Sequence, residues 1–178
     1  MSVISKKVCL IGDFSVGKTS LIRRFVDRQF SDRYLSTVGV KISRKLIDCS
    51  SNNSGQKIKL QLLIWDIEGR TKFKSIAPTY LQGAKGVIVV ADVNRQETVA
   101  RIKDHIDLFA SVNKRGFKSI IAFNKSDTIE SEKLEKILQQ NQFSDSPQMI
   151  DTYATSAKTG KNVDIIFEKL ARSIIAET

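Results

Sequence analysis

A glycine-containing turn near the start of the sequence constrains the fold more than any other segment. Residues 12–19 read GDFSVGKT and match the pattern GxxxxGK followed by Ser or Thr. In this pattern backbone N–H groups curl around phosphate groups, and the positive end of the following helix points at them. Lys18 would reach the β- and γ-phosphates, and the Thr19 hydroxyl would bind Mg²⁺. We therefore expect a nucleotide to contact Ser15, Val16, Gly17, Lys18, Thr19 and Ser20.

Apolar and amphipathic runs alternate along the rest of the chain. The pattern predicts strands over 6–12, 39–48, 57–66, 86–93, 119–124 and 149–156, and helices over 17–29, 97–112, 131–140 and 162–177. Ser131 is a candidate helix cap. We predict an α/β fold with a six-stranded, mostly parallel sheet, helices on both faces and a ligand site at the carboxyl ends of the strands. The 178 residues fit one compact domain, 1–178.

Two further motifs follow predicted strands and indicate which base is bound. Asn124-Lys125-Ser126-Asp127 comes directly after one apolar strand, and TSAK (155–158) follows the last strand. The carboxylate of Asp127 can accept two hydrogen bonds from guanine that adenine cannot donate, so a buried Asp127 would reject adenine. TSAK can supply backbone N–H groups to the guanine oxygen. We expect the base to be bound by Asn124, Lys125, Asp127, Ser156, Ala157 and Lys158.

With these motifs the sequence resembles the Ras superfamily of small GTPases, and it is most similar to the Rab branch. The resemblance covers about residues 6–176. It rests on GDFSVGKTSLIRRF (12–25), STVGV (36–40), WDIEGR (65–70), YLQGA (80–84), NKSD (124–127) and TSAK (155–158). It implies a P-loop nucleoside triphosphatase fold, a bound GTP or GDP with Mg²⁺, and hydrolysis of GTP to GDP and phosphate.

The resemblance also assigns roles to residues in two segments, 30–40 and 66–76, which would be the switches that the γ-phosphate orders. Thr37 would bind Mg²⁺ and the γ-phosphate, and Asp66 would hold Mg²⁺ through water. Phe30 would pack against guanine, Tyr34 would close over the phosphates, and the Gly69 N–H would touch the γ-phosphate. Two simpler interpretations stay open: Phe30 as a core residue at a helix end, and Thr37 as an ordinary loop hydroxyl.

Two departures from the family fall on hydrolysis. The catalytic set would be Lys18, Thr37, Gly69 and, as the doubtful member, Arg70, which stands where the family has a Gln that orients the attacking water. Arg only donates hydrogen bonds, so it cannot orient water in the same way. Phe14 stands at a P-loop position that is small in the family, where it would crowd an activator's arginine finger. We expect slow hydrolysis and resistance to such activators.

Alternatives to this interpretation remain. Phe14 could turn to solvent while Arg70 merely occupies a loop, or Arg70 could itself stabilise charge on the γ-phosphate. Glu68 is a third departure, which could be solvated or pair with Arg70 or Lys72. For the whole chain, the leading function is a slow GTPase switch, and the alternative is a GTP-binding scaffold with negligible hydrolysis. A metabolic P-loop kinase is a third reading, against which NKSD argues.

The net charge is +10, from 29 Lys and Arg against 19 Asp and Glu. Basic residues gather around the switches and the strands between them: Arg33, Lys41, Arg44, Lys45, Lys57, Lys59, Arg70, Lys72 and Lys74. We expect effector, exchange-factor and activator proteins to bind the switches and this basic strand face, with an acidic partner or an anionic surface the best match. The alternative is a solvated set of charges that blocks strand-edge pairing. No nucleic acid is expected.

Rab proteins also bind effectors through a Phe, Trp and Tyr cluster. Trp65 and Tyr80 match two of its members, whereas Ile42 stands where the Phe would be. Trp65 could equally be a packing residue.

A few residues bear on location and on redox state. Cys9 lies in an apolar strand pattern and Cys49 in a polar connection, and we interpret both as reduced thiols. His105 stands alone in a polar stretch, so we expect it at the surface. The final residues, RSIIAET, contain no cysteine for a lipid anchor. We expect a cytoplasmic monomer that only a partner would bring to a membrane.

Overall fold

The computed structural model describes residues 3–33, 35–50, 57–69, 75–143, 146 and 148–176, and it contains the predicted α/β sheet. The strands are β1 (Val3–Gly12), β2 (Val40–Ser50), β3 (Lys57–Ile67), β4 (Gly86–Asp92), β5 (Lys118–Asn124) and β6 (Met149–Ala154). The helices are α1 (Lys18–Asp27), α2 (Gln96–Ala100), α3 (Ile102–Val112), α4 (Ser131–Gln140) and α5 (Val163–Ala176). Two 3₁₀ turns span Pro78–Tyr80 and Ser126–Thr128.

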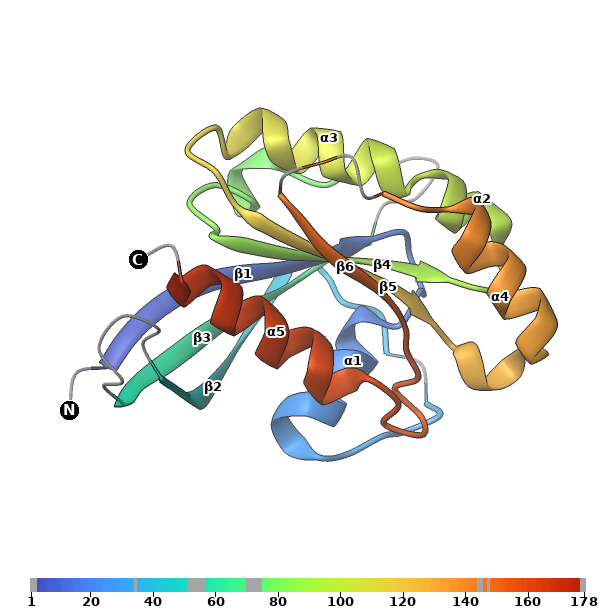
Figure 1. Cartoon of the computed structure of the whole chain (residues 1–178), viewed down its shortest axis with the longest axis horizontal. Coiled ribbons are helices and arrows are strands. Elements are labelled where there is room, and N and C mark those ends of the chain that lie inside the picture. The colour runs from blue at the N-terminus through green and yellow to red at the C-terminus, as the bar shows by residue number, and fades with distance from the viewer. Residues whose placement is uncertain are drawn as a thin grey trace.

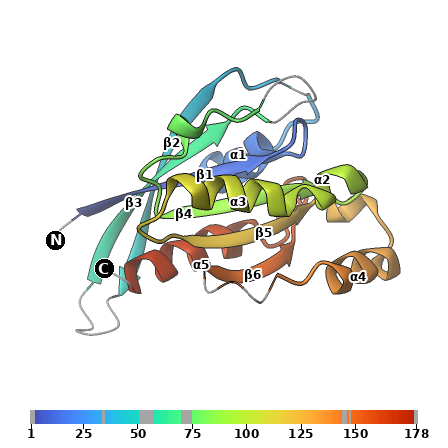
Figure 2. The same cartoon turned by 90° about the horizontal axis from the view of Figure 1, so that it is seen from above.

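The six strands form one sheet in the order β2-β3-β1-β4-β5-β6. All neighbours pair in parallel except β2 and β3, which form an antiparallel hairpin. Figure 2 shows β2 and β6 at opposite edges. Because β1, β5 and β6 run parallel to one another, their carboxyl ends lie at one end of the sheet, and the loops that follow them carry the P-loop, NKSD and TSAK.

Helices cover both faces of the sheet, so two apolar layers form (Figure 1). On one face, α1 and α5 pack on the strands, and the rings of Phe25 and Phe167 stack with centroids 4.2 Å apart. On the other face lie α2, α3 and α4, with Phe109 at the centre of α3. All seven residues of β4 are buried, as a strand covered on both faces requires. The predicted fold class is confirmed.

Several local predictions need correction. The helix predicted over 97–112 is broken at Arg101, whose φ of −91° and ψ of 1° lie outside the helical range, so that α2 and α3 are separate. Ser131 is the first residue of α4 rather than its cap, since Glu130 occupies the cap position and no side chain caps the helix there. Cys49 lies in β2 and is buried in the α1–α5 layer, because β2 continues further than the polar sequence indicates.

Among the described residues, no helix is both long enough and apolar enough to cross a membrane.

Candidate functional site

A cavity opens where the P-loop (12–19) joins β1 to α1. Its lining comes from the P-loop, α1, the segment 30–37, Gly69 and Lys125. The full set is Phe14, Ser15, Gly17, Lys18, Thr19, Ser20, Arg23, Phe30, Ser31, Arg33, Leu35, Thr37, Gly69 and Lys125. The structure thus brings together the phosphate-binding pattern and both predicted switches. Val16 is fully buried beneath the loop instead of lining the cavity.

Lys18 is buried at the base of this cavity and held by the loop's own backbone. Its Nζ donates hydrogen bonds to the carbonyls of Gly12 (3.3 Å) and Asp13 (2.9 Å). Burial lowers the pKa of the Lys18 ammonium to about 8, although the carboxylates of Asp66 and Asp13 act in the opposite direction. A cation is therefore fixed where the sequence pattern expects phosphate.

Three oxygen-bearing side chains from distant parts of the sequence meet beside Lys18. The Thr19 hydroxyl donates to Asp66 Oδ2 at 2.6 Å, and it lies 2.8 Å from the hydroxyl of Thr37. Thr37 also contacts Asp66 Oδ2 at 3.4 Å. Within the described part of the chain, Asp66 Oδ1 is buried and has no hydrogen-bond partner. Burial raises the pKa of Asp66 above its ordinary value, against the Thr19 hydrogen bond and the nearby Lys18 charge.

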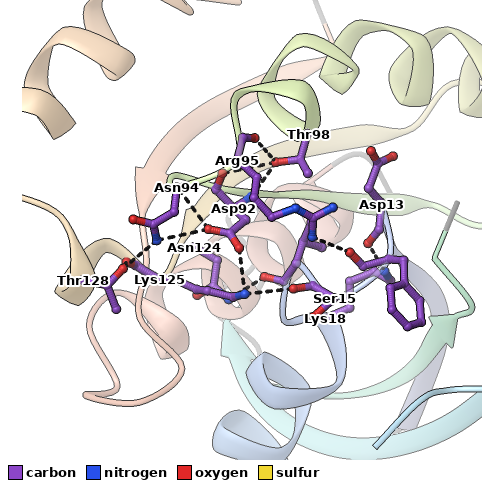
Figure 3. Close-up of polar contacts among 12 residues, drawn as sticks. Asp13, Ser15, Lys18, Asp92, Asn94, Arg95, Thr98, Asn124, Lys125 and Thr128 are labelled. Atoms are coloured by element: carbon purple, nitrogen blue, oxygen red, sulfur yellow. Dashed lines mark hydrogen bonds and ion pairs between the residues drawn. The ribbon is translucent and has the colours of Figure 1, made fainter. Parts of the chain in front are cut away.

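The motif NKSD holds the P-loop through its first two side chains (Figure 3). Asn124 Nδ2 donates to the Val16 carbonyl at 2.9 Å. Lys125 Nζ donates to the Ser15 carbonyl at 2.9 Å and pairs with Asp92 Oδ2 at 2.7 Å. Gly17 has a φ of +103°, which other residues rarely adopt, and a Cβ there would lie 2.2 Å from Asn124 Nδ2, so a larger residue would strain the loop and displace this amide.

Asp127 and the TSAK segment lie together at the neighbouring strand ends. The Ser156 hydroxyl donates to Asp127 Oδ1 at 2.6 Å, and the Ser126 N–H donates to the Thr155 carbonyl. Ala157 is buried, with its carbonyl accepting from Arg24 Nε, while Lys158 is exposed. Asp127 itself is exposed, not buried as the sequence argument assumed. Its selectivity would therefore depend on the bound base excluding water.

The two predicted switch segments contact each other and the P-loop. The Glu68 N–H donates to the Gly39 carbonyl at 2.8 Å, and the Gly39 N–H donates to Glu68 Oε2 at 2.9 Å. A Cβ on Gly69 would come within 2.6 Å of the Phe14 backbone, so glycine is needed for this close approach. Glu68, whose partner the sequence left open, thus binds the first switch.

Phe30 and Phe14 both lie on the cavity wall. Phe30 is half-buried and also packs against the α1–α5 layer, so its two sequence interpretations are compatible. Phe14 lines the cavity with 38% of its surface exposed. Tyr34, Arg70, Lys72 and Lys74 lie outside the described residues, so what was expected of them stays a prediction.

Sequence reasoning missed a second polar cluster behind the P-loop. His105 is buried, with 2% of its surface exposed, and its Nε2 lies 3.0 Å from Asp13 Oδ1. The expectation of a surface histidine is therefore wrong. Arg101 Nη1 pairs with Asp13 Oδ2, and Arg95 Nη1 donates to the Phe14 carbonyl at 2.7 Å. The sequence did offer one signal for this cluster. Asp13 is an acidic residue in the P-loop, and a buried carboxylate needs a cationic partner.

The predicted basic strand face is divided between the two faces of the β2–β3 hairpin. Side chains alternate along a strand, so Lys41 and Lys45 lie on the face that α1 covers, where Lys45 Nζ donates to the Val26 carbonyl. Arg44 and Lys59 lie on the opposite face with Ile42 and Trp65. We call Ile42, Arg44, Leu46, Leu63 and Trp65 the outer hairpin face.

Comparison with known proteins adds to this geometry. The model of the Ras family matches residues 7–176. Similar proteins include Ras-related protein Rab-13 of Bos taurus, 34% identical over 172 residues, which are 97% of this chain and 81% of the relative. Ras-related protein Rab-1D of Dictyostelium discoideum is 35% identical over 173 residues, which are 94% of this chain and 78% of the relative. GTP-binding protein ypt1 of Schizosaccharomyces pombe is 33% identical over 168 residues, which are 94% of this chain and 79% of the relative.

Replacing Asn124 tests the contact between NKSD and the P-loop. Asn124→Ala leaves the buried Val16 carbonyl and the Thr155 hydroxyl without this partner. We expect the free energy of unfolding in urea to fall by about 1–3 kcal/mol. The control Lys136→Ala, on the exposed face of α4, should stay within about 0.5 kcal/mol of the wild type. An Asn124→Ala change no larger than the control would show that this contact contributes nothing.

Proposed function

Since this chain belongs to the Ras family of small GTPases and is most similar to its Rab branch, we propose that it is a slow GTPase switch. In this proposal residues 1–178 form one G domain that binds GTP and GDP and presents different surfaces in the two states. The observation that carries the proposal is the meeting of Thr19, Thr37 and Asp66 beside the buried Lys18. These residues come from α1, the first switch and β3, so a γ-phosphate there would act on both switches.

Mg²⁺ fits the oxygen atoms at this point. Thr19 and Thr37 would bind it directly, and Asp66 through water. The support is the buried Asp66 Oδ1, which has no hydrogen-bond partner among the described residues, in a set of neutral and anionic oxygens that suits a hard cation. When bound, the ion would neutralise charge on the phosphates.

The remaining chemistry falls to the chain's own groups. Lys18 would stabilise negative charge that develops on the β- and γ-phosphate oxygens, and the Gly69 N–H would contact the γ-phosphate while water attacks in line. The attacking water would be poorly oriented, because Arg70 can only donate hydrogen bonds, whereas a Gln could also accept one from the water. Phe14 lines the cavity and its backbone lies against Gly69, and we infer that its side chain would crowd the space that an arginine finger needs.

A second candidate is a GTP-binding scaffold with negligible hydrolysis. The presence of Phe14 among the cavity-lining residues favours it, since a large side chain at this position would restrict both water and activators. The meeting of Thr19, Thr37 and Asp66 favours the switch, since a scaffold without turnover has less need of a complete metal site.

Single-turnover hydrolysis of pre-bound GTP separates the two candidates. We expect slow hydrolysis that stops when EDTA removes Mg²⁺, and we expect Arg70→Gln to raise the rate at least about tenfold, or about 1.4 kcal/mol. A wild-type rate equal to that of Arg70→Gln would contradict the proposal that Arg70 slows hydrolysis. Tight GTP binding without detectable turnover would replace the switch by the scaffold.

Recognition of guanine is tested at Asp127. Asp127→Asn replaces one of the two carboxylate oxygens that would accept from the guanine N1–H and amine, and we expect GDP affinity to fall about 100-fold, since one hydrogen bond to a charged group contributes about 1.5–3 kcal/mol. Xanthosine diphosphate has a carbonyl in place of that amine, so its affinity should rise. The control Asp164→Asn removes a surface carboxylate that pairs with Arg28. Unchanged GDP affinity in Asp127→Asn would exclude this role.

The outer hairpin face is the surface that we propose for effector proteins. Ile42 and Leu46 are exposed, Trp65 lies half-buried under Lys7 Nζ at 3.7 Å from the ring centroid, and Arg44 is exposed. An apolar strip with cationic neighbours favours an amphipathic partner with acidic residues. Lys41 and Lys45, on the other side of the hairpin, could contribute only at its edge.

Charge reversal on the outer hairpin face tests this surface. A partner that prefers the GTP-loaded chain should bind Arg44→Glu at least about tenfold more weakly, a loss of about 1.4 kcal/mol. It should bind Lys136→Glu on α4 as it binds the wild type, since α4 packs near β6, at the opposite edge of the sheet. Equal binding to both variants would place the partner elsewhere.

A further inference from the structure

The P-loop is held from behind by side chains that sequence reasoning did not connect with the nucleotide. Asp13, its second residue, does not line the cavity. Both of its carboxylate oxygens are instead bound by residues around the α2–α3 junction: Oδ1 by His105 Nε2 at 3.0 Å, and Oδ2 by Arg101 Nη1. A carboxylate only accepts hydrogen bonds, so Nε2 of His105 carries the proton of this contact.

This cluster is buried and its charges are matched. Asp13 and His105 each expose 2% of their surface, and the Arg101 side chain about a third. Burial alone would raise the pKa of Asp13, but hydrogen bonds from His105 and Arg101 hold it below its ordinary value. Asp13 therefore stays anionic in a dry position, and removal of either partner would leave a buried charge incompletely compensated.

The position of Asp13 fixes groups that do face the cavity. Its main-chain carbonyl accepts the 2.9 Å hydrogen bond from Lys18 Nζ, the cation expected to bind the β- and γ-phosphates. The next carbonyl, that of Phe14, accepts from Arg95, at the turn before α2 (Figure 3). A shift of Asp13 would move both the Lys18 ammonium and the backbone N–H groups that follow it.

The break between α2 and α3 is a separate observation that also connects this region with Asp13. Arg101 lies at that break with φ −91° and ψ 1°, and the His105 N–H donates to the Arg101 carbonyl at 3.1 Å. The two residues stand four apart, on one side of the first turn of α3, and both reach Asp13. The departure from one continuous helix thus coincides with the residue that completes the cluster.

We propose that Arg101 and His105 are positioning residues for phosphate binding: through Asp13 they set how tightly Lys18 and the P-loop hold the β-phosphate. The proposal rests on the proposed function and adds a determinant of nucleotide retention that lies outside the switches. It places control of the phosphate site partly at the start of α3, on the side of the P-loop away from the cavity.

The test compares GDP with GMP, because GMP lacks the phosphates that Lys18 reaches. Fluorescent GDP is titrated into the whole chain, and unlabelled GDP and GMP compete for the site. In His105→Leu and in Arg101→Met we expect GDP affinity to fall about 5- to 150-fold, the usual range of coupling between sites. GMP affinity should fall much less, so the preference for GDP shrinks. A general loss of stability would lower both affinities together.

Conservative and remote variants complete the design. His105→Gln keeps an N–H donor and Arg101→Lys keeps the charge, so each should recover part of the preference for GDP. Lys103→Met, on the same helix between the two residues, breaks only a surface pair with Asp107 and should match the wild type. If His105→Leu does not fold, Arg101→Met alone tests the proposal. The Arg101 side chain is partly exposed, so its replacement should disturb folding less.

Two results would overturn the inference: equal losses of GDP and GMP affinity in both variants, or no loss in either. The wild-type titration is read first and tests the proposed function separately. Folded wild-type chain that binds no GDP would overturn the proposed function and this inference with it.

Discussion

The backbone of the P-loop is held by a side-chain hydrogen bond at every carbonyl from residue 12 to residue 16, and the rest of the site depends on this. The donors are Lys18 to Gly12 and Asp13, Arg95 to Phe14, Lys125 to Ser15, and Asn124 to Val16. We propose that the N–H groups of the same loop, held in place in this way, bind a phosphate. The donors come from α1, the turn after β4 and the end of β5, so the sheet itself fixes the loop.

In the proposed function, binding and hydrolysis depend on different side chains of this site. Groups that would hold phosphate and metal, such as Lys18, Thr19 and Asp66, are buried or half-buried and tied to strands or to α1. The departures that bear on hydrolysis, Phe14 and Arg70, stand where the family needs a small residue and a water-orienting Gln. We propose that this chain keeps the electrostatics of nucleotide binding while it loses the geometry for an attacking water, because the side chains at positions 14 and 70 bear on hydrolysis rather than on holding phosphate or metal.

Local sequence signals failed where burial came from distant partners. His105 lies in a polar stretch, and nothing near it in sequence indicates that Asp13 would receive it 92 residues away. The break at Arg101 was missed for the same reason, since its neighbours favour a continuous helix. The charges on β2 were expected on one face, although alternation along the predicted strand already separates Lys41 from Arg44; the tertiary structure shows which of the two faces α1 covers.

The sequence by itself determined the α/β fold and the family, because GDFSVGKT, NKSD and TSAK require strand ends and helix starts at fixed spacings and occur in that order. The positions of the six strands followed from their apolar residues, although β1 begins three residues earlier and β2 ends two residues later than predicted. Only the tertiary structure decided which side chains hold the P-loop from behind, which residue Glu68 binds and which face each basic strand residue occupies. These depend on contacts between segments far apart in the chain, and residue type alone does not encode distance in space.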